Sequence, residues 1–310
     1  MEKISDIKTL TEEELKNWLK EVGEKPFRAD QIRNRLFCGQ VKSFNEMETI
    51  PAALREKLSA NFRITSLEEA KRLISVDGTV KWLYQTHDGH HIETVLIPTN
   101  DRFSVCVSTQ IGCAQNCAFC RTAKMGFIRN LEAGEILEEI IRVNWYLEET
   151  GTKHSDGSLA KVTNIIFMGM GEPLNNLEQV HRVCCTLHHQ KLFNLGRKRM
   201  TISTSGVVPK IKELVDRNTP CCLAVSLNST NDERRSAVMP VNKVWNIAKL
   251  LEATDEYTKR TGNYVTFEFV LMKGITCSEE AAKELIRICA PRRCKVNAIV
   301  LNDGDDPTLE

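Results

Sequence analysis

Residues 113–127 read CAQNCAFCRTAKMGF and place Cys113, Cys117 and Cys120 in a CxxxCxxC pattern. The first residues of the chain, MEKISDIKTLTEEELKNW, are polar and lack the apolar core of a secretion signal. In a reducing compartment, clustered cysteines indicate metal binding or sulfur catalysis rather than disulfides. A structural zinc site needs a fourth ligand, and no second CxxC or histidine pair follows at a suitable spacing. Three thiolates can instead hold three irons of a [4Fe–4S] cluster and leave the fourth iron open, so the segment predicts a cluster of this kind.

Around this segment, short apolar runs alternate with helical stretches. The apolar runs, which we expect to be strands, are 103–110, 163–169, 200–206, 222–228, 265–272 and 295–301. The stretches with helical periodicity are 133–149, 177–189, 209–217, 245–262 and 278–289. Apolar strands that are each followed by a helix predict a parallel sheet covered by helices, in an α/β fold of six units. Periodicity alone does not choose between a partial barrel and an open sheet.

Polar or glycine-rich tips follow most of these strands. The cysteine segment follows the first strand, GMGEP (169–173) the second, STSG (203–206) the third and SLN (226–228) the fourth, while Asn302 follows the sixth. In parallel β/α arrays, ligands gather at the carboxyl ends of the strands. We therefore expect the five tips to form one site.

The residues before this array have a different organisation. Three amphipathic helices are expected at 9–23, 25–37 and 50–62, the first with a threonine and acidic residues at its start. Strand-like runs separated by Asp-Gly pairs over 72–99 predict a three-stranded β-meander. The expected domains are a helical N-terminal module (1–62), a β-meander that links it onward (63–100) and the β/α array (101–310).

Composition limits the class of protein. The 310 residues carry a formal net charge of only +1, so any contact with nucleic acid must come from a local patch. No stretch reaches the ~18 uninterrupted apolar residues of a membrane span. A soluble cytoplasmic protein with no membrane contact is the expectation.

CxxxCxxC after the first strand of a β/α array resembles the radical S-adenosylmethionine (SAM) superfamily. Longer strings, CVSTQIGCAQNCAFC, KMGFIRNL, IIFMGMGEPLNN, TISTSGVVP and LAVSLN, resemble the RlmN-type family of dual-specificity RNA methyltransferases. PFRADQIRNRLF and IETVLIP extend the resemblance over nearly the whole chain. It implies a partial (β/α)6 TIM-like radical SAM barrel, a [4Fe–4S] cluster held by the three cysteines, and SAM as cofactor. The residues that it places around SAM are Gly171, Glu172, Ser203, Ser226, Leu227, Asn228 and Asn302.

The same resemblance implies the reaction. Such enzymes methylate C2 of an adenine in 23S ribosomal RNA and in some transfer RNAs, a carbon too electron-poor to attack a methyl sulfonium directly, and a radical generated from SAM solves this problem. Glu93 matches the family's proton acceptor. Cys106 matches a second cysteine, which forms a disulfide that frees the product, although a core cysteine is an equally good interpretation. The resemblance also implies an external electron donor of the flavodoxin type, and we expect a monomer.

The sequence departs from the family at several points. The family's methyl-accepting cysteine lies after the sixth strand, and nothing in LNDGDDPTLE matches it. We therefore expect a truncated C-terminal end, and a chain that binds cluster and SAM without completing methyl transfer. Asn228 stands where the family usually has histidine, and Ile-Val-Leu precedes Asn302 in place of Ile-Pro. Arg121-Thr122-Ala123 replaces the common Ser-Thr-Gly.

RNA contacts are expected from local basic residues. They are Lys25, Arg28, Arg33 and Arg35 in the N-terminal module, with 196–200, Arg234, Arg235 and 291–295 in the array. Such residues can neutralise phosphates, and salt would then weaken the binding. The N-terminal module is predicted to be RNA-binding mainly through the resemblance.

Other interpretations stay open. One is a divergent radical SAM enzyme that methylates C8 of an RNA adenine or activates a protein substrate, or a truncated form without activity. Another is a zinc-stabilised RNA-binding module that is not an enzyme. The sequence does not choose between ribosomal and transfer RNA.

Overall fold

The computed structural model describes residues 5–64, 67–273 and 276–301. Two compact units divide the chain. The first contains residues 1–108, 131–165 and 178–199, and the second contains 109–130, 166–177 and 200–310. Each unit is described by itself.

The first unit begins with a small helical part. Its elements are β1 (Ser5–Asp6), η1 (Ile7–Thr9), α1 (Glu12–Glu21), α2 (Arg28–Cys38), η2 (Phe44–Glu46), α3 (Ala52–Asn61) and β2 (Phe62–Arg63). Thr11 and Glu14 form a reciprocal capping box that starts α1. Apolar side chains at helical spacing, such as Leu15, Leu19 and Ile32, are fully buried. The three helices expected over 9–62 are confirmed.

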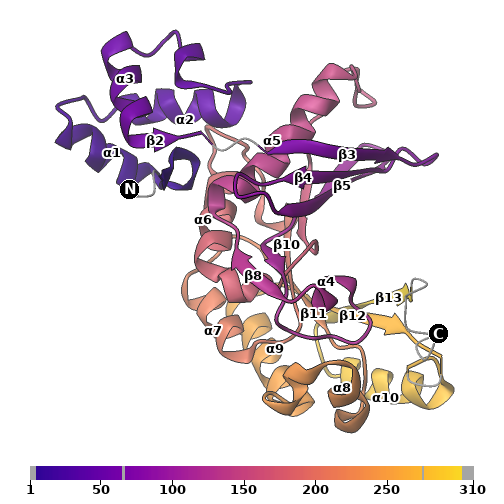
Figure 1. Cartoon of the computed structure of the whole chain (residues 1–310). Coiled ribbons are helices and arrows are strands. Elements are labelled where there is room, and N and C mark those ends of the chain that lie inside the picture. The colour runs from indigo at the N-terminus through magenta and orange to yellow at the C-terminus, as the bar shows by residue number, and fades with distance from the viewer. Residues whose placement is uncertain (1–4, 65–66, 274–275, 302–310) are drawn as a thin grey trace. The chain divides into compact units, whose positions relative to one another are not determined.

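Antiparallel strands follow in the same unit (Figure 1). They are β3 (Glu68–Ile74), β4 (Val80–Gln85), β5 (His91–Thr99) and β6 (Arg102–Cys106), with β9 (Asn164–Phe167) next to β6 in the strand order. The predicted meander is confirmed and gains a fourth antiparallel strand, because β6 pairs with β5. The unit also contains α5 (Ala133–Glu149), most of α6 (Leu177–His188) and η4 (Arg197–Arg199).

The second unit contains parallel strands and their helices (Figure 1). The strands β10 (Met200–Thr204), β11 (Cys222–Ser226), β12 (Val265–Leu271) and β13 (Cys294–Val300) pair in chain order, all parallel. The helices are α7 (Val208–Asp216), α8 (Asp232–Val238), η5 (Pro240–Lys243), α9 (Ile247–Thr261) and α10 (Glu279–Cys289). Asn246 caps the start of α9, and Gly262 ends it with φ +69°.

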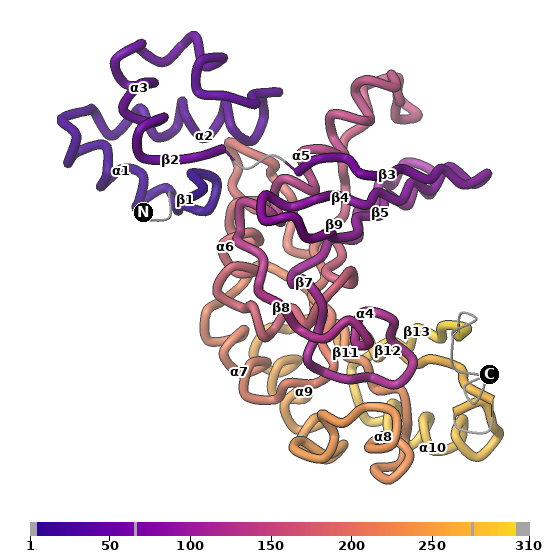
Figure 2. Tube along the Cα trace, viewed as in Figure 1, coloured from indigo at the N-terminus to yellow at the C-terminus, as the bar shows by residue number. Residues whose placement is uncertain are grey.

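A short antiparallel ribbon in the second unit was not expected from the sequence. It pairs β7 (Gln110–Gly112) with β8 (Phe127–Asn130), and α4 (Arg121–Lys124) precedes β8 (Figure 2). The predicted first strand, 103–110, therefore ends as β6 at Cys106, and Gln110 begins a new strand. The loop between β7 and α4 carries the three cysteines.

The predicted α/β class and its alternating strands and helices are confirmed. Each of the six expected strands and five expected helices is present, within a few residues of its predicted bounds. In the described part of the chain, none of the helices has the length and apolar character that crossing a membrane requires.

Candidate cluster and cofactor site

The cysteine loop is closed at its base by two glycines. The Cys113 amide donates a hydrogen bond to the Gly126 carbonyl at 3.1 Å. Gly112 has φ +72°, and a Cβ placed on it would lie 1.7 Å from that same carbonyl oxygen. Only glycine allows this approach, so the two ends of the loop meet at one point.

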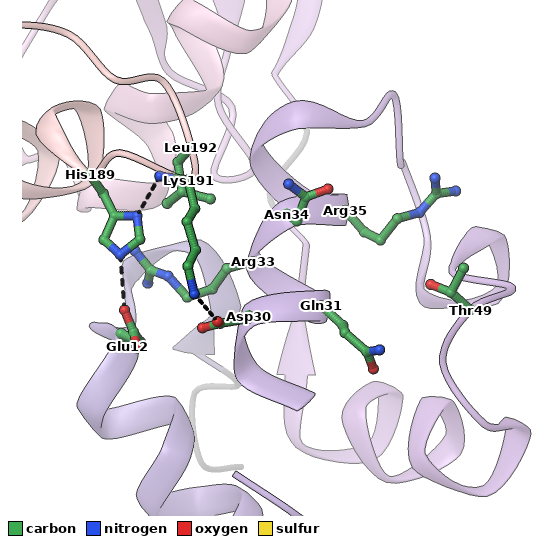
Figure 3. Close-up of a pocket in the computed structure, with 10 residues that line it drawn as sticks. All are labelled: Glu12, Asp30, Gln31, Arg33, Asn34, Arg35, Thr49, His189, Lys191 and Leu192. Atoms are coloured by element: carbon green, nitrogen blue, oxygen red, sulfur yellow. Dashed lines mark hydrogen bonds and ion pairs between the residues drawn. The ribbon is translucent and has the colours of Figure 1, made fainter. Parts of the chain in front are cut away.

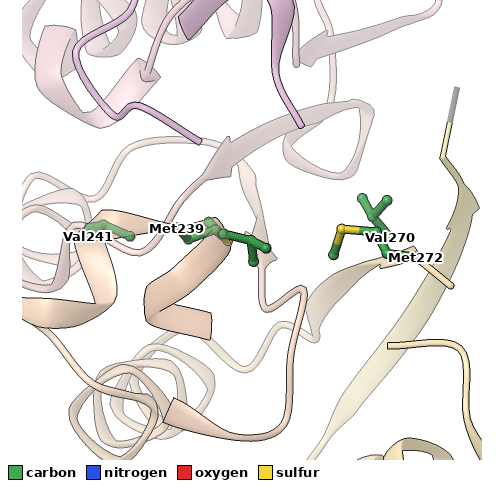
Figure 4. Packing of buried hydrophobic residues seen from close by; sticks show 5 residues of the cluster. Met239, Val241, Val270 and Met272 are labelled. Atoms are coloured by element: carbon green, nitrogen blue, oxygen red, sulfur yellow. The ribbon is translucent and has the colours of Figure 1, made fainter. Parts of the chain in front are cut away.

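Apolar packing holds the middle of the loop. Cys117, Ala118 and Phe119 pack against a buried cluster of Val238, Met239, Val241, Val270 and Met272 (Figure 4). The Ala118 amide also donates to the Val238 carbonyl at 2.9 Å. These contacts are made within the protein itself, so the loop has a defined path without a ligand.

The three thiols form one electrostatic group. Cys113 is buried, and Cys117 and Cys120 are half-buried. Burial and the charges of the other two thiolates raise the pKa of Cys117 to about 12 and raise that of Cys113 as well. Positive charge at the loop would reverse this effect, because thiolates are the form that binds metal. The donor chemistry, three thiols on one short loop, thus fits an iron–sulfur cluster. No group of three or more His, Cys, Asp or Glu in the described residues is arranged to hold a single metal ion.

The GMGEP tip lies against the start of β7. The Glu172 amide donates to Gln110 Oε1 at 2.8 Å. Gly171 has φ +102°, and a Cβ there would lie 2.6 Å from the Cβ of Gln110, which explains the glycine. Gln110 Nε2 donates in turn to Asn130 Oδ1 at 2.7 Å. Gln110 is thus a link between the tip and the ribbon that the sequence prediction missed.

The Glu172 carboxylate binds main-chain groups of the protein itself. Only 3% of the residue is exposed. Its two oxygens accept hydrogen bonds from the Ser205 amide at 2.7 Å and the Leu174 amide at 3.1 Å. Burial raises the pKa of Glu172, and the bonds to Ser205 and Leu174 oppose that rise. The carboxylate therefore fixes the tip after β9 to the end of β10.

The remaining predicted SAM contacts lie at the ends of β10 and β11. Ser203 is half-buried in β10, and Ser226 is the last residue of β11. The Leu227 amide donates to the Glu268 carbonyl at 3.0 Å. Asn228 is buried with φ +50°, and its Oδ1 accepts from the Val270 amide at 2.9 Å. The side chain of Asn228 therefore joins the tip to β12. Asn302 lies outside the described residues.

Arg235 is the second functional candidate that the sequence prediction missed. It was expected on the surface as a phosphate contact, and that expectation is wrong, because the side chain is completely buried on α8. The signal was available in part: the apolar AVMP (237–240), which begins two residues after Arg235, predicts that this end of the segment is buried.

The two predicted catalytic residues lie in the first unit. Glu93 on β5 is half-exposed, and its Oε1 pairs with Lys81 Nζ at 2.7 Å. The Ser108 hydroxyl donates to the Glu93 carbonyl at 2.7 Å. Cys106 is half-buried at the end of β6, opposite Val95.

Two family models match the chain. Residues 5–64 match the ribosomal RNA large subunit methyltransferase N-terminal domain, and residues 107–286 match the radical SAM superfamily. The probable dual-specificity RNA methyltransferase RlmN of Bacillus licheniformis is 42% identical over 94% of this chain and 78% of its own length. The dual-specificity RNA methyltransferase RlmN of Anaeromyxobacter dehalogenans is 41% identical over 96% of this chain and 79% of its own. The chain belongs to the RlmN family of radical SAM methyltransferases.

A solved structure agrees with this membership. The crystal structure of a radical SAM methyltransferase from Sphaerobacter thermophilus has a TM-score of 0.91 and 38% identity, covering 98% of this chain and 87% of that one. As an RlmN-family member, the chain is a radical SAM RNA methyltransferase, and its fold is the radical SAM α/β fold. The N-terminal match ends within one residue of β2, and the radical SAM match begins directly after β6.

Proposed function

We propose that this chain acts on C2 of adenosine in 23S ribosomal RNA and in some transfer RNAs, with a [4Fe–4S] cluster and SAM. The observation that supports the proposal most directly is the three-thiol loop in the same unit as the strand ends predicted to bind SAM. Cys113, Cys117 and Cys120 would hold the cluster. When bound, the reduced cluster supplies the electron that cleaves the sulfonium of SAM.

The ends of the strands would bind SAM. Gly171 allows the close approach of Gln110 to its tip, and Ser203, Ser226, Leu227 and Asn228 belong to the neighbouring tips. Because the Glu172 carboxylate already accepts two main-chain hydrogen bonds, we propose that it shapes this rim and that main-chain groups of the tip make the contact with SAM. Such a rim is formed before the ligand arrives, which lowers the cost of binding.

Glu93 is proposed as the base that removes the C2 proton. With 43% of its side chain exposed, the carboxylate is accessible to a bound nucleotide. An adenine unstacked from RNA would cover it, and loss of water would raise its proton affinity toward the range that a general base needs. Cys106 is proposed as the second cysteine of the reaction, in the role that the resemblance gives it in release of the product.

The segment 1–62 is proposed as the RNA-binding module. A cavity of about 480 Å³ opens beside α2, lined by Glu12, Asp30, Gln31, Arg33, Asn34, Arg35, Thr49, His189, Lys191 and Leu192 (Figure 3). Glu12 contacts His189 at 3.1 Å, and Asp30 pairs with Lys191 at 2.7 Å. Arg33 makes neither pair but is buried, and its Nη1 donates to the Leu10 carbonyl at 2.9 Å, so the expectation that it contacts phosphate is wrong. Arg35 is half-exposed and is the lining arginine that a phosphate could reach.

The test of the reaction is anaerobic reconstitution with iron and sulfide, followed by incubation with SAM, a reductant and RNA fragments. We expect about four irons per chain, absorbance near about 400 nm and release of 5′-deoxyadenosine. One zinc per chain without that absorbance would favour the zinc-stabilised module instead. Mass spectrometry of the RNA separates 2-methyladenosine from the 8-methyl product. 2-Methyladenosine in the RNA would support the proposed reaction, and SAM cleavage without any methylated RNA would contradict it.

Two variants test the roles of individual residues. Where 2-methyladenosine forms, Glu93→Gln lowers its rate by about 10²–10⁴-fold and leaves SAM cleavage intact. Glu69→Gln, which removes an exposed carboxylate from β3, is the matched control and changes neither. For the RNA-binding module, Arg35→Met weakens RNA binding and reduces its salt slope by about one. An external electron donor, a monomeric state and a cytoplasmic location stay predictions.

A further inference from the structure

Arg235 connects the ends of two neighbouring strands. Nη2 donates to the Ser205 carbonyl at 2.7 Å and to the Ser226 carbonyl at 2.9 Å. Nε donates to the Leu227 carbonyl at 2.9 Å, and Nη1 donates to Asn242 Oδ1 at 2.9 Å. Three of these acceptors are main-chain carbonyls directly after β10 or at the end of β11. One guanidinium thus fixes the spacing of two tips in the predicted SAM rim.

The charge of Arg235 is not neutralised by these contacts. All four acceptors are neutral groups, and the whole residue is excluded from solvent. Burial lowers the pKa of Arg235 to about 10, so the guanidinium remains a cation at neutral pH. The acidic groups that interact electrostatically with it are Cys117 and Asp232. A cation in such a place is costly unless negative charge lies within range.

The helix that carries Arg235 also supports the cysteine loop. α8 ends at Val238, whose carbonyl accepts the Ala118 amide, and Val238 and Met239 belong to the apolar cluster under Cys117 (Figure 4). The segment from Arg235 to Met239 therefore contacts both halves of the site. A single short helix links the cysteine loop to the ends of β10 and β11.

We propose that Arg235 is a positioning residue that sets the SAM rim through its carbonyl contacts and provides a buried positive charge on the helix that packs against the cysteine loop. The inference rests on the proposed function, because it needs the cluster at Cys117. A cluster held by three thiolates becomes more negative when it is reduced. A fixed cation nearby stabilises the reduced form and raises the reduction potential. The geometric role needs the planar fork of donors, which lysine cannot reproduce.

The experiment compares Arg235→Met and Arg235→Lys with Arg234→Met in the reconstituted chain. Arg234 is the neighbouring arginine, half-exposed and paired with Glu284, and serves as the matched control. The readouts are the thermal midpoint of the iron-free chain, the midpoint potential of the cluster by redox titration, and the dissociation constant of SAM by equilibrium dialysis. None of them depends on turnover.

We expect Arg235→Met to lower the cluster potential and to weaken SAM binding about tenfold or more, since charged hydrogen bonds to the rim are lost. Arg235→Lys should keep the potential near that of the wild type and still weaken SAM binding. Arg234→Met should change neither. Unchanged potential and unchanged SAM binding in Arg235→Met would overturn the proposal, and if that variant does not fold, unchanged SAM binding in Arg235→Lys overturns it. A wild-type chain that assembles no cluster would contradict the proposed function instead.

Discussion

Two carboxylates, Glu172 and Glu93, show how differently the two units treat charge. Glu172 is almost entirely buried, and both of its oxygens accept main-chain amides. Glu93 is half-exposed and pairs with one lysine, Lys81, that is equally exposed. The first carboxylate is part of a completed structure, whereas the second is available to a ligand. The comparison teaches that the strand ends of the second unit are formed in advance, while the meander of the first unit offers a surface that RNA would complete.

The largest effect is expected when one of the predicted cluster ligands in the second unit is removed. Cys117→Ala removes one cluster ligand from the loop, so bound iron should fall from about four per chain to a small fraction, and SAM cleavage should fall to background. Iron analysis and release of 5′-deoxyadenosine measure both. Cys185→Ala, which removes an exposed thiol on α6, is the control and should change neither. Full iron content in Cys117→Ala would refute the assignment of the loop.

The next effect concerns the base of the same loop. Gly112 and Gly126 both have positive φ, but an added Cβ overlaps the chain only at Gly112. Gly126→Ala should lower the free energy of unfolding by about 1–2 kcal/mol from backbone strain alone. Gly112→Ala should cost about 3 kcal/mol or more, because main-chain atoms must move apart. Chemical denaturation of the two iron-free variants measures the difference, and equal losses would show that the loop does not need its closed base.

A third prediction tests a buried acid in the first unit. Glu139 on α5 is fully buried, and its Oε2 accepts the Thr94 hydroxyl at 2.5 Å and the Ser108 amide at 3.0 Å. Burial raises its pKa well above the ordinary 4.5, so the folded chain keeps this proton to a higher pH than the unfolded chain. Its contribution to stability is complete below pH 4.5 and is lost as pH rises toward the folded pKa.

Glu139→Gln keeps the shape of the side chain and removes its ionisable carboxyl group. The free energy of unfolding of the variant, relative to the wild type, should therefore rise with pH and reach about 1–3 kcal/mol at alkaline pH. Denaturation at a series of pH values above 4.5 gives the slope. Parallel curves for the two proteins would mean that Glu139 is ionised in the folded chain.

The smallest effect is expected at the open surface. Lys81→Met removes the partner of Glu93, and because both side chains are more than 40% exposed, the free energy of unfolding should change by less than about 1 kcal/mol. Chemical denaturation measures the change. If the free energy of unfolding fell by more than about 2 kcal/mol, the pair of Lys81 and Glu93 would be a structural contact, and Glu93 would no longer differ from Glu172 in this respect.

Much of the fold could be predicted because its signals are local. The strand run 265–272 and the helical run 133–149 are long, strongly patterned segments, and the structure has β12 and α5 there. The ribbon of β7 and β8 could not be predicted in the same way. Its strands are short, and the side-chain amide of Gln110, at the start of one of them, joins Glu172 to Asn130. Such a contact between distant residues leaves no periodic pattern.

The residues of the candidate site also differ in whether the sequence alone could predict their roles. The cysteine pattern and the glycines of GMGEP point to their chemistry in the sequence itself. Arg235 looks like one half of a surface Arg-Arg pair, and only the fold shows that one arginine is buried while its neighbour faces solvent. For Asn228, the sequence shows the exchange of a histidine for asparagine, but only the structure shows the amide bound to β12.

The contact between Gly112 and Gly126 has a consequence for evolution and design. Because the intervening segment leaves and re-enters the ribbon at one place, its length and composition can change without displacing β7 or β8. The spacing of the three cysteines and the packing of Cys117, Ala118 and Phe119 on the apolar cluster still have to be kept. Transplanting the segment therefore needs a recipient hairpin that tolerates the same glycine pair and an apolar surface beside it.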